Sequence, residues 1–148
     1  MRLSEIMTRG VETISLEDTV QEAARRMQQA DVGFLPVIQN ATAVGIVTDR
    51  DIVVRVIAAG RDPAGTFIGE VMSHGVAKAE GEADPNRTGA VESLHVDEDV
   101  GTALDLMRRK QLRRILVHDD DYRMVGVVSL ADFARGATVT TTASTTPT

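Results

Sequence analysis

The stretch Gly45-Ile46-Val47-Thr48-Asp49-Arg50-Asp51 returns in the second half of the chain as Gly126-Val127-Val128-Ser129-Leu130-Ala131-Asp132. Both copies read glycine, two apolar residues, a hydroxyl residue, two variable residues and an aspartate. The apolar pair predicts the end of a buried strand, and the hydroxyl-to-aspartate spacing is typical of the first turn of a helix. Two such copies in one chain indicate an internal duplication.

Two further blocks repeat in the same order and strengthen that interpretation. Leu3-Ser4-Glu5-Ile6-Met7 matches Ile68-Gly69-Glu70-Val71-Met72, and Val20, Ala23, Ala24 and Met27 match Val100, Ala103, Leu104 and Met107. The spacing between matched blocks widens around residues 76–90, which places an insertion there. Because this insertion is polar and rich in turn-forming residues, we expect a surface loop.

The apolar periodicity predicts the order β-α-β-β-α in each half. A short extended segment (Val11 to Ser15, or Val91 to His95) precedes a helix that begins near Asp18 or Asp97. Then follow a buried strand (Phe34 to Ile38, or Ile115 to Val117), a polar turn (Gln39 to Ala43, or Asp119 to Arg123), and a second strand that ends at Thr48 or Ser129. A second helix begins at once, and in the first half its predicted inward stripe is Ile52, Val53, Val56 and Ile57.

This pattern predicts an α/β (α+β) fold built from two repeats. We expect the first repeat at residues 1–62 and the second at residues 63–136, followed by a disordered threonine-rich tail at residues 137–148. A unit of about 60 residues buries only about 60% of the surface of its unfolded chain. We therefore expect the two repeats to pack sheet to sheet and to share a core.

Composition narrows the class of protein. The chain has 148 residues, 43% hydrophobic and 26% charged, with no cysteine and a net charge of −6. The absence of cysteine excludes disulfides and thiolate metal sites. Apolar runs are far shorter than the roughly 20 residues of a membrane span, and no secretory signal is evident, so we expect a cytoplasmic protein. The acidic balance argues against nucleic-acid binding.

The repeated motif has two interpretations. A helix N-terminus offers free N–H groups to an anion, and an aspartate there can accept hydrogen bonds from a sugar diol. The same spacing is also that of a capping box, which needs no ligand. Two copies at equivalent places favour a ligand role, and the two roles are compatible.

The two halves resemble a tandem pair of cystathionine-β-synthase (CBS) domains, also called a Bateman module, of the stand-alone type. The resemblance runs from about Leu3 to Arg135 and rests on the Glu-Ile-Met and Glu-Val-Met openings, on Gly33-Phe34-Leu35-Pro36-Val37, and on the two motifs. It implies packing around a pseudo-twofold axis, two clefts, and a homodimer. It also implies an adenine ligand such as AMP, ADP or ATP, or in some members S-adenosylmethionine or NAD.

The resemblance also assigns roles to residues. Asp51 and Asp132 would hold ribose hydroxyls, and Thr48 and Ser129 would contact ribose or phosphate. The base would lie against Thr13, Ile14, Phe34, Leu35 and Pro36 in the first repeat, and against Leu94, Ile115 and Leu116 in the second. Leu116 departs from the pattern, since the first repeat has Pro36 at that place.

The basic residues indicate that the two sites differ. Arg50 lies inside the first motif, while Arg113 and Arg114 stand where the first repeat has Gly33 and Phe34. Because guanidinium groups pair bidentately with phosphate, we expect one phosphate-bearing ligand at Thr48, Arg50, Asp51, Arg113 and Arg114. The site around Ser129 and Asp132 would then be weaker or empty. The alternative for Arg113 and Arg114 is a plain surface role.

These observations favour a non-enzymatic regulatory module that signals to an unknown downstream protein. The alternative is a structural or interaction protein whose ligand sites are vestigial. No nucleophile, general base or catalytic cofactor site is evident. We expect no metal site either, since His74, His95 and His118 lack ligand spacing and Asp119-Asp120-Asp121 fits a solvated turn.

Overall fold

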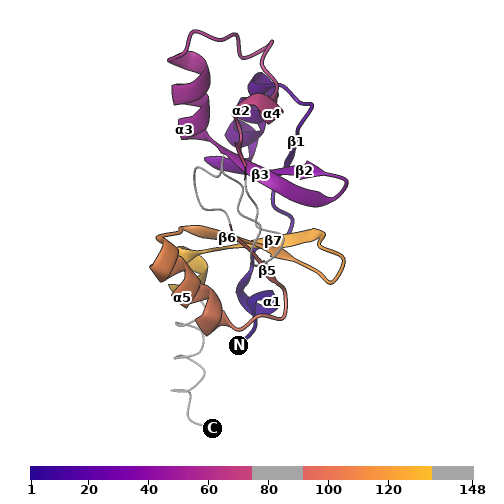
Figure 1. Ribbon diagram of the computed structural model, residues 1–148, viewed down its shortest axis with the longest axis vertical. Helices are drawn as coiled ribbons and strands as arrows, with labels where there is room; N and C mark the ends of the chain where they lie inside the picture. Colours follow the sequence, from indigo (N-terminus) through magenta and orange to yellow (C-terminus); the bar gives the residue numbers. More distant parts are fainter. Residues whose placement is uncertain (75–91, 135–148) are drawn as a thin grey trace. The chain divides into compact units, whose positions relative to one another are not determined.

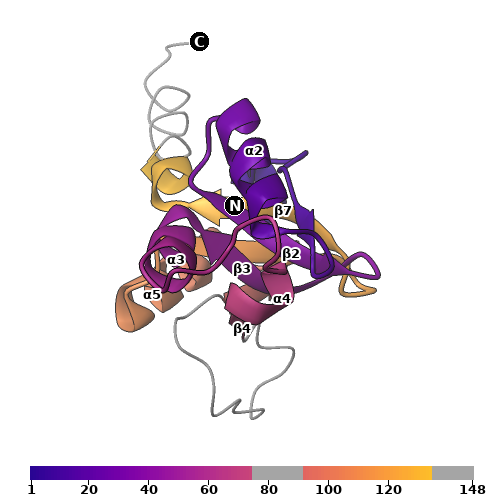
Figure 2. The same cartoon turned by 90° about the horizontal axis from the view of Figure 1, so that it is seen from above.

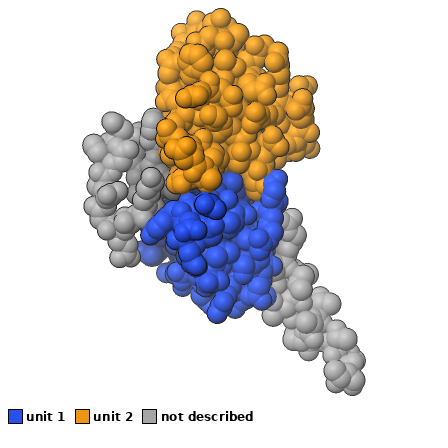
Figure 3. Space-filling view, turned by 90° about the vertical axis from the view of Figure 1, so that its right-hand side faces the viewer, with its two compact units in different colours: residues 1–10, 92–148 blue, residues 11–91 orange. Residues whose placement is uncertain are grey.

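The structure, a computed structural model, describes residues 1–74 and 92–134 (Figure 1). These residues form two compact units, coloured separately in Figure 3. Unit 2 holds residues 11–74, and unit 1 holds residues 1–10 together with residues 92–134. The expected insertion at residues 76–90 and the threonine-rich tail lie outside the described residues.

Unit 2 is a four-stranded sheet with helices on one face (Figures 1 and 2). Strand β1 (Ile14–Ser15) runs parallel to β2 (Phe34–Gln39), which pairs antiparallel with β3 (Thr42–Thr48), and β3 pairs antiparallel with β4 (Ser73–His74). The helical elements are α2 (Val20–Ala30), α3 (Asp49–Ile52), the π-helical turn η1 (Val53–Ile57) and α4 (Ile68–Val71).

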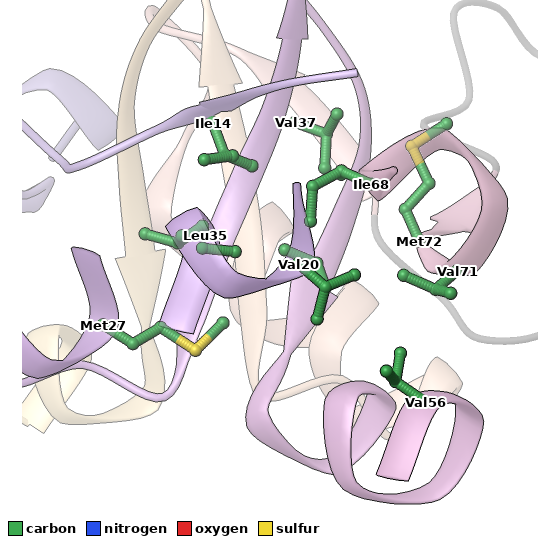
Figure 4. Packing of buried hydrophobic residues seen from close by; sticks show 11 residues of the cluster. Ile14, Val20, Met27, Leu35, Val37, Val56, Ile68, Val71 and Met72 are labelled. Carbon is green, nitrogen blue, oxygen red and sulfur yellow. The ribbon is translucent and has the colours of Figure 1, made fainter. Parts of the chain in front are cut away.

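The core of unit 2 lies between this sheet and its helices (Figure 4). Helix α2 directs Val20, Ala23 and Met27 inward, because residues three and four apart share one helix face. The strands contribute Leu35 and Val37, which alternate with residues on the other face of β2.

Unit 1 repeats the plan with a three-stranded sheet. Strand β5 (Glu92–His95) runs parallel to β6 (Arg114–His118), which pairs antiparallel with β7 (Met124–Ser129). Helices α1 (Leu3–Ile6) and α5 (Val100–Lys110) lie on one face, and a further helix begins at Leu130. The predicted β-α-β-β-α order is therefore confirmed in both repeats.

The two long helices begin and end alike. Thr19 caps α2 by accepting a hydrogen bond from the Glu22 N–H (3.2 Å), and Asp99 caps α5 by accepting one from the Gly101 N–H (2.7 Å). Each helix ends at a non-glycine residue in the left-handed region, Asp31 in one and Gln111 in the other.

Each opening segment packs on the sheet of the other repeat. In unit 1 the Leu3 N–H donates to the Glu98 carbonyl (3.0 Å), and Thr8 exchanges two hydrogen bonds with Val127 (2.9 and 3.1 Å). In unit 2 the Ile68 N–H donates to the Asp18 carbonyl (2.9 Å), and β4 extends the sheet beyond β3. The division by packing thus differs from the linear division into residues 1–62 and 63–136.

The motif glycines make this close approach sterically feasible. A Cβ atom on Gly45 would lie 2.5 Å from the Ser73 carbonyl oxygen, and one on Gly126 would lie 2.8 Å from the Thr8 carbonyl oxygen. Both distances are shorter than van der Waals contact. A side chain at Gly45 would therefore collide with β4, and one at Gly126 would collide with the segment around Thr8 that bridges to β7.

The predicted inward stripe after β3 is partly wrong. Val56 is fully buried, but Val53 and Ile57 are exposed. Helix α3 widens into a π-helical turn here, since the Ala58 N–H donates to the Val53 carbonyl (2.9 Å). The change in helical spacing turns Val53 and Ile57 away from the core.

Candidate functional site

The first motif forms a closed hydrogen-bond pair where β3 meets α3. The Thr48 N–H donates to Asp51 Oδ2 (2.9 Å), and the Asp51 N–H donates to Thr48 Oγ1 (3.2 Å). This is the capping box that the spacing predicts. The Asp51 side chain is only 12% exposed, so the pair is well shielded from solvent.

Arg55 faces Oδ1, the other carboxylate oxygen of Asp51. Its Nε lies 3.8 Å from Asp51 Oδ1, one helical turn along the chain. Its Nη1 also donates to the carbonyls of Val71 (2.9 Å) and Met72 (3.4 Å). Sequence reasoning missed Arg55, although the four-residue spacing from Asp51 was a usable signal.

The second motif has the same backbone contact and a different hydroxyl contact. The Ser129 N–H donates to Asp132 Oδ2 (2.8 Å), and the Ser129 hydroxyl donates to the same oxygen (3.1 Å). Asp132 is 3% exposed, one of the few buried polar residues in the described chain. The acid of the second motif is thus held more deeply than that of the first.

Both motifs are also tied to the start of the neighbouring strand. The Asp49 N–H donates to the Gly33 carbonyl (2.8 Å), and the Leu130 N–H donates to the Arg113 carbonyl (3.3 Å). Phe34 pairs with Thr48 across the sheet, as Arg114 pairs with Ser129. Within each unit, therefore, the predicted residues at the start of the middle strand lie beside the motif.

Several of the predicted base-contacting residues have buried side chains. Ile14 and Leu35 belong to the core of unit 2, and Ile115 and Leu116 are fully buried in the chain. Any ligand contact made by Ile14 or Leu35 would therefore come through the main chain. By alternation, Phe34 and Pro36 lie on the opposite face of β2 from Leu35. Leu94 is half-buried in β5.

The segment that enters β1 is fixed by a residue that sequence reasoning missed. Arg26 Nη1 donates to the Thr13 carbonyl (2.6 Å), and its Nε lies 3.3 Å from Glu22 Oε1. This guanidinium turns the Thr13 carbonyl toward α2. In unit 1 the start of β5 is held by a different contact. Lys110 Nζ lies 2.5 Å from the buried carboxylate of Glu92.

The predicted phosphate-binding arginines fall in both units. Arg50 is exposed in unit 2, whereas Arg113 is exposed and Arg114 half-buried in unit 1. The predicted set with Thr48 and Asp51 therefore draws on residues of two compact units.

The Asp119-Asp120-Asp121 turn is held by its own backbone. Hydrogen bonds from the Arg123 N–H (3.0 Å) and the Asp121 N–H (2.9 Å) lower the pKa of the Asp119 carboxyl. Across the described ranges, 1–74 and 92–134, no three histidine, aspartate or glutamate side chains gather as metal ligands would. Within those ranges no helix is long and apolar enough to cross a membrane.

Two compact units with one repeated strand-and-helix order, each with a Ser/Thr-to-Asp helix start, define a tandem-repeat α/β module. The family model described as "CBS domain" matches residues 3–58 and again residues 68–137. The chain therefore belongs to the CBS-domain family, and it carries two copies of the domain.

Its relatives include proteins of similar size. CBS domain-containing protein YhcV of Bacillus subtilis (strain 168) is 36% identical over 132 residues, which are 89% of this chain and 82% of that protein. The crystal structure of Hypoxic Response Protein I with two coordinated zinc ions is 29% identical, with a TM-score of 0.72, over 91% of this chain and 98% of that one.

The fold is shared more widely than the sequence. The crystal structure of CBSX2 in complex with AMP has a TM-score of 0.72 and covers 95% of this chain and 98% of that one. Its sequence identity is 20%, so this likeness concerns the fold alone.

Proposed function

We propose that the protein is a non-enzymatic regulatory module that binds an adenine nucleotide, AMP, ADP or ATP, and passes the signal to another protein. Membership of the CBS-domain family supports a regulatory ligand-binding role. The observation that carries the proposal is the duplicated motif, since both units retain a shielded aspartate hydrogen-bonded to the hydroxyl residue at a strand end. A ligand-level sensor of this kind would respond to the energy state of the cell.

The residues proposed for the ligand are those predicted from the sequence. Asp51 and Asp132 would accept hydrogen bonds from ribose hydroxyls, and Arg50, Arg113 and Arg114 would meet phosphate. The fold shared with an AMP complex is compatible with this assignment. We further propose a homodimer, which sedimentation equilibrium would reveal as a doubled mass.

One observation favours a second function. Both motif aspartates already have intramolecular partners, so each motif satisfies its own hydrogen bonds without a ligand. On that alternative the protein is a structural or interaction module with vestigial ligand sites.

Thermal unfolding with added ligands separates the two functions. AMP, ADP, ATP, NAD and S-adenosylmethionine are each added in excess. A ligand at about 100 times its Kd stabilises the folded state by about 2.7 kcal/mol. A raised Tm with an adenine nucleotide supports the proposal, and no shift with any of the five supports the vestigial alternative.

Calorimetric titration of two variants then assigns the stronger site. We expect Asp51→Ala to weaken nucleotide binding more than Asp132→Ala, because Arg50 lies inside the first motif. A larger loss from Asp132→Ala would overturn that assignment.

A further inference from the structure

Arg55 joins the first motif to the segment that the second repeat contributes to unit 2. One side of the guanidinium faces the Asp51 carboxylate (Nε to Oδ1, 3.8 Å), while Nη1 donates to the carbonyls of Val71 and Met72. Those carbonyls end helix α4, where backbone acceptors lack partners within the helix. Arg55 is therefore both an ion-pair partner of the motif acid and a cap on α4.

The backbone that carries Arg55 is well anchored. Val56, the next residue, is fully buried in the cluster that also holds Ile68 and Val71 (Figure 4). Arg55 itself lies in the π-helical turn η1, a geometry found frequently at functional sites. Movement of the Arg55 side chain would therefore be felt at α4 without a shift of the helix that carries it.

Residues 68–74 are held to unit 2 by the buried side chains of Ile68, Val71 and Met72 and by the pairing of β4 with β3. Polar contacts add to this packing. The Ile68 and Gly69 N–H groups donate to the carbonyls of Asp18 and Leu16 (2.9 and 3.1 Å). One further side-chain contact comes from Arg61, whose Nη2 lies 3.0 Å from Glu70 Oε1. Residues 68–74 belong to unit 2, although the second CBS domain begins at residue 68, so contacts made by this segment act on the start of the second repeat.

We propose that Arg55 couples ligand binding at Asp51 to the docking of residues 68–74 on unit 2; this inference rests on the proposed function. A ribose hydroxyl that donates to Asp51 Oδ1 shares the oxygen that faces Arg55 and weakens their attraction. The guanidinium then caps the carbonyls of Val71 and Met72 less often, and the segment undocks more often. The second repeat has Gly136 where the first has Arg55, and the coupling is proposed for the first motif.

Amide hydrogen exchange on the full chain, with and without AMP, tests the coupling. In the wild type, we expect AMP to slow exchange at the Asp51 amide and to accelerate it about threefold at Ile68 and Gly69. Local acceleration on binding is diagnostic, because ligands ordinarily protect. In Arg55→Gln, exchange at Ile68 and Gly69 is about tenfold faster without ligand, and AMP adds nothing.

Arg61→Gln is the matched control. It removes a cationic contact to the same segment without touching Asp51. We expect faster exchange at Gly69 in this variant too, but AMP should still accelerate it further. Bound AMP that leaves exchange at Ile68 and Gly69 unchanged in the wild type, or accelerates it equally in Arg55→Gln, overturns the coupling and leaves the proposed function standing.

If AMP does not bind at all, the proposed function fails and a ligand-free cycle decides the coupling. Asp51→Asn removes the charge that faces Arg55. We expect it to accelerate exchange at Gly69 in the wild type and to have no effect in the Arg55→Gln background. Equal effects in both backgrounds would overturn the coupling as well.

Discussion

The two copies of the motif differ less in their own residues than in what surrounds them. In unit 2, the Asp51 side chain keeps 12% of its surface exposed and faces Arg55, which in turn caps α4. In unit 1, Asp132 is buried and receives two hydrogen bonds from Ser129. The comparison teaches that one repeated pattern can place its acid either where a partner can reach it or where it mainly supports the fold.

The largest effect should come from filling the motif glycines. We expect Gly45→Ala to lower the free energy of unfolding by about 3 kcal/mol and Gly126→Ala by about 2 kcal/mol, since the added Cβ collides with β4 in one unit and with the segment around Thr8 in the other. The order follows from the shorter approach at Gly45, 2.5 Å against 2.8 Å. Urea denaturation measures both.

Gly69→Ala is the control for these variants. A Cβ there would meet Leu16 Cδ2 at 3.4 Å, an ordinary contact, and alanine favours a helix. We expect Gly69→Ala to be neutral or stabilising. A loss below about 0.5 kcal/mol at Gly45 would show that β4 does not pack against β3 as described.

The two aspartates should differ in their effect on stability without ligand. We expect Asp132→Ala to cost about 2 kcal/mol and Asp51→Ala about 1 kcal/mol, because the buried carboxylate accepts two hydrogen bonds. Thermal and urea unfolding give the comparison. The exposed Asp105→Ala should be near neutral, and equal losses at Asp51 and Asp132 would remove the contrast between the units.

For ligand affinity we expect the opposite order, with Asp51→Ala weakening nucleotide binding more than Asp132→Ala. Such a reversal would separate the structural role of the second motif from the binding role of the first.

The smallest effect concerns the hairpin turns. The turn after β6 contains Asp119, whose pKa is lowered chiefly by the Arg123 N–H and further by the Asp121 N–H. A pKa below that of the unfolded chain stabilises the fold above the ordinary aspartate range, and that contribution is lost as pH falls through the lowered value. Acid should therefore loosen this turn, while the turn at Asn40 and Ala41, which has no titratable side chain, should not respond.

NMR titration of the Asp119 carboxyl group, with amide exchange at Tyr122 as a second readout, measures this effect. Asp119→Asn should reduce the acid response of the turn. If the pKa of Asp119 is no lower than the ordinary aspartate value, the hydrogen bonds to its carboxylate are not maintained in solution.

The regular elements could be predicted from sequence because their causes are local. Apolar spacing fixed the inward face of α2, and the Thr48-to-Asp51 spacing indicated a helix start that the structure contains. The exposure of Val53 and Ile57 could not be predicted, because an ordinary α-helical spacing was assumed where the chain forms a π-helical turn.

The features that were missed depend on contacts between distant residues. Nothing in Leu3 to Met7 says which of two similar sheets will receive the segment, since both sheets offer a glycine at the same place. Arg26 was overlooked because its partner is a main-chain carbonyl, at Thr13, which has no signature in the sequence. The roles of the predicted ligand residues remain proposals that the binding experiments address.

The opening segment of each repeat packs on the sheet of the other repeat, and this exchange bears on how such a chain could have arisen. Suppose that the ancestor had one repeat and formed a dimer in which the first residues of each copy packed on the sheet of the other copy. Fusing the two copies end to end would keep the hydrogen bonds now made by Leu3, Thr8 and Ile68. Gene fusion would then have required only a linker between the two copies, with no change in the fold of either. Cutting the modern protein at the border between repeats should, by the same reasoning, yield fragments that recombine rather than fold apart.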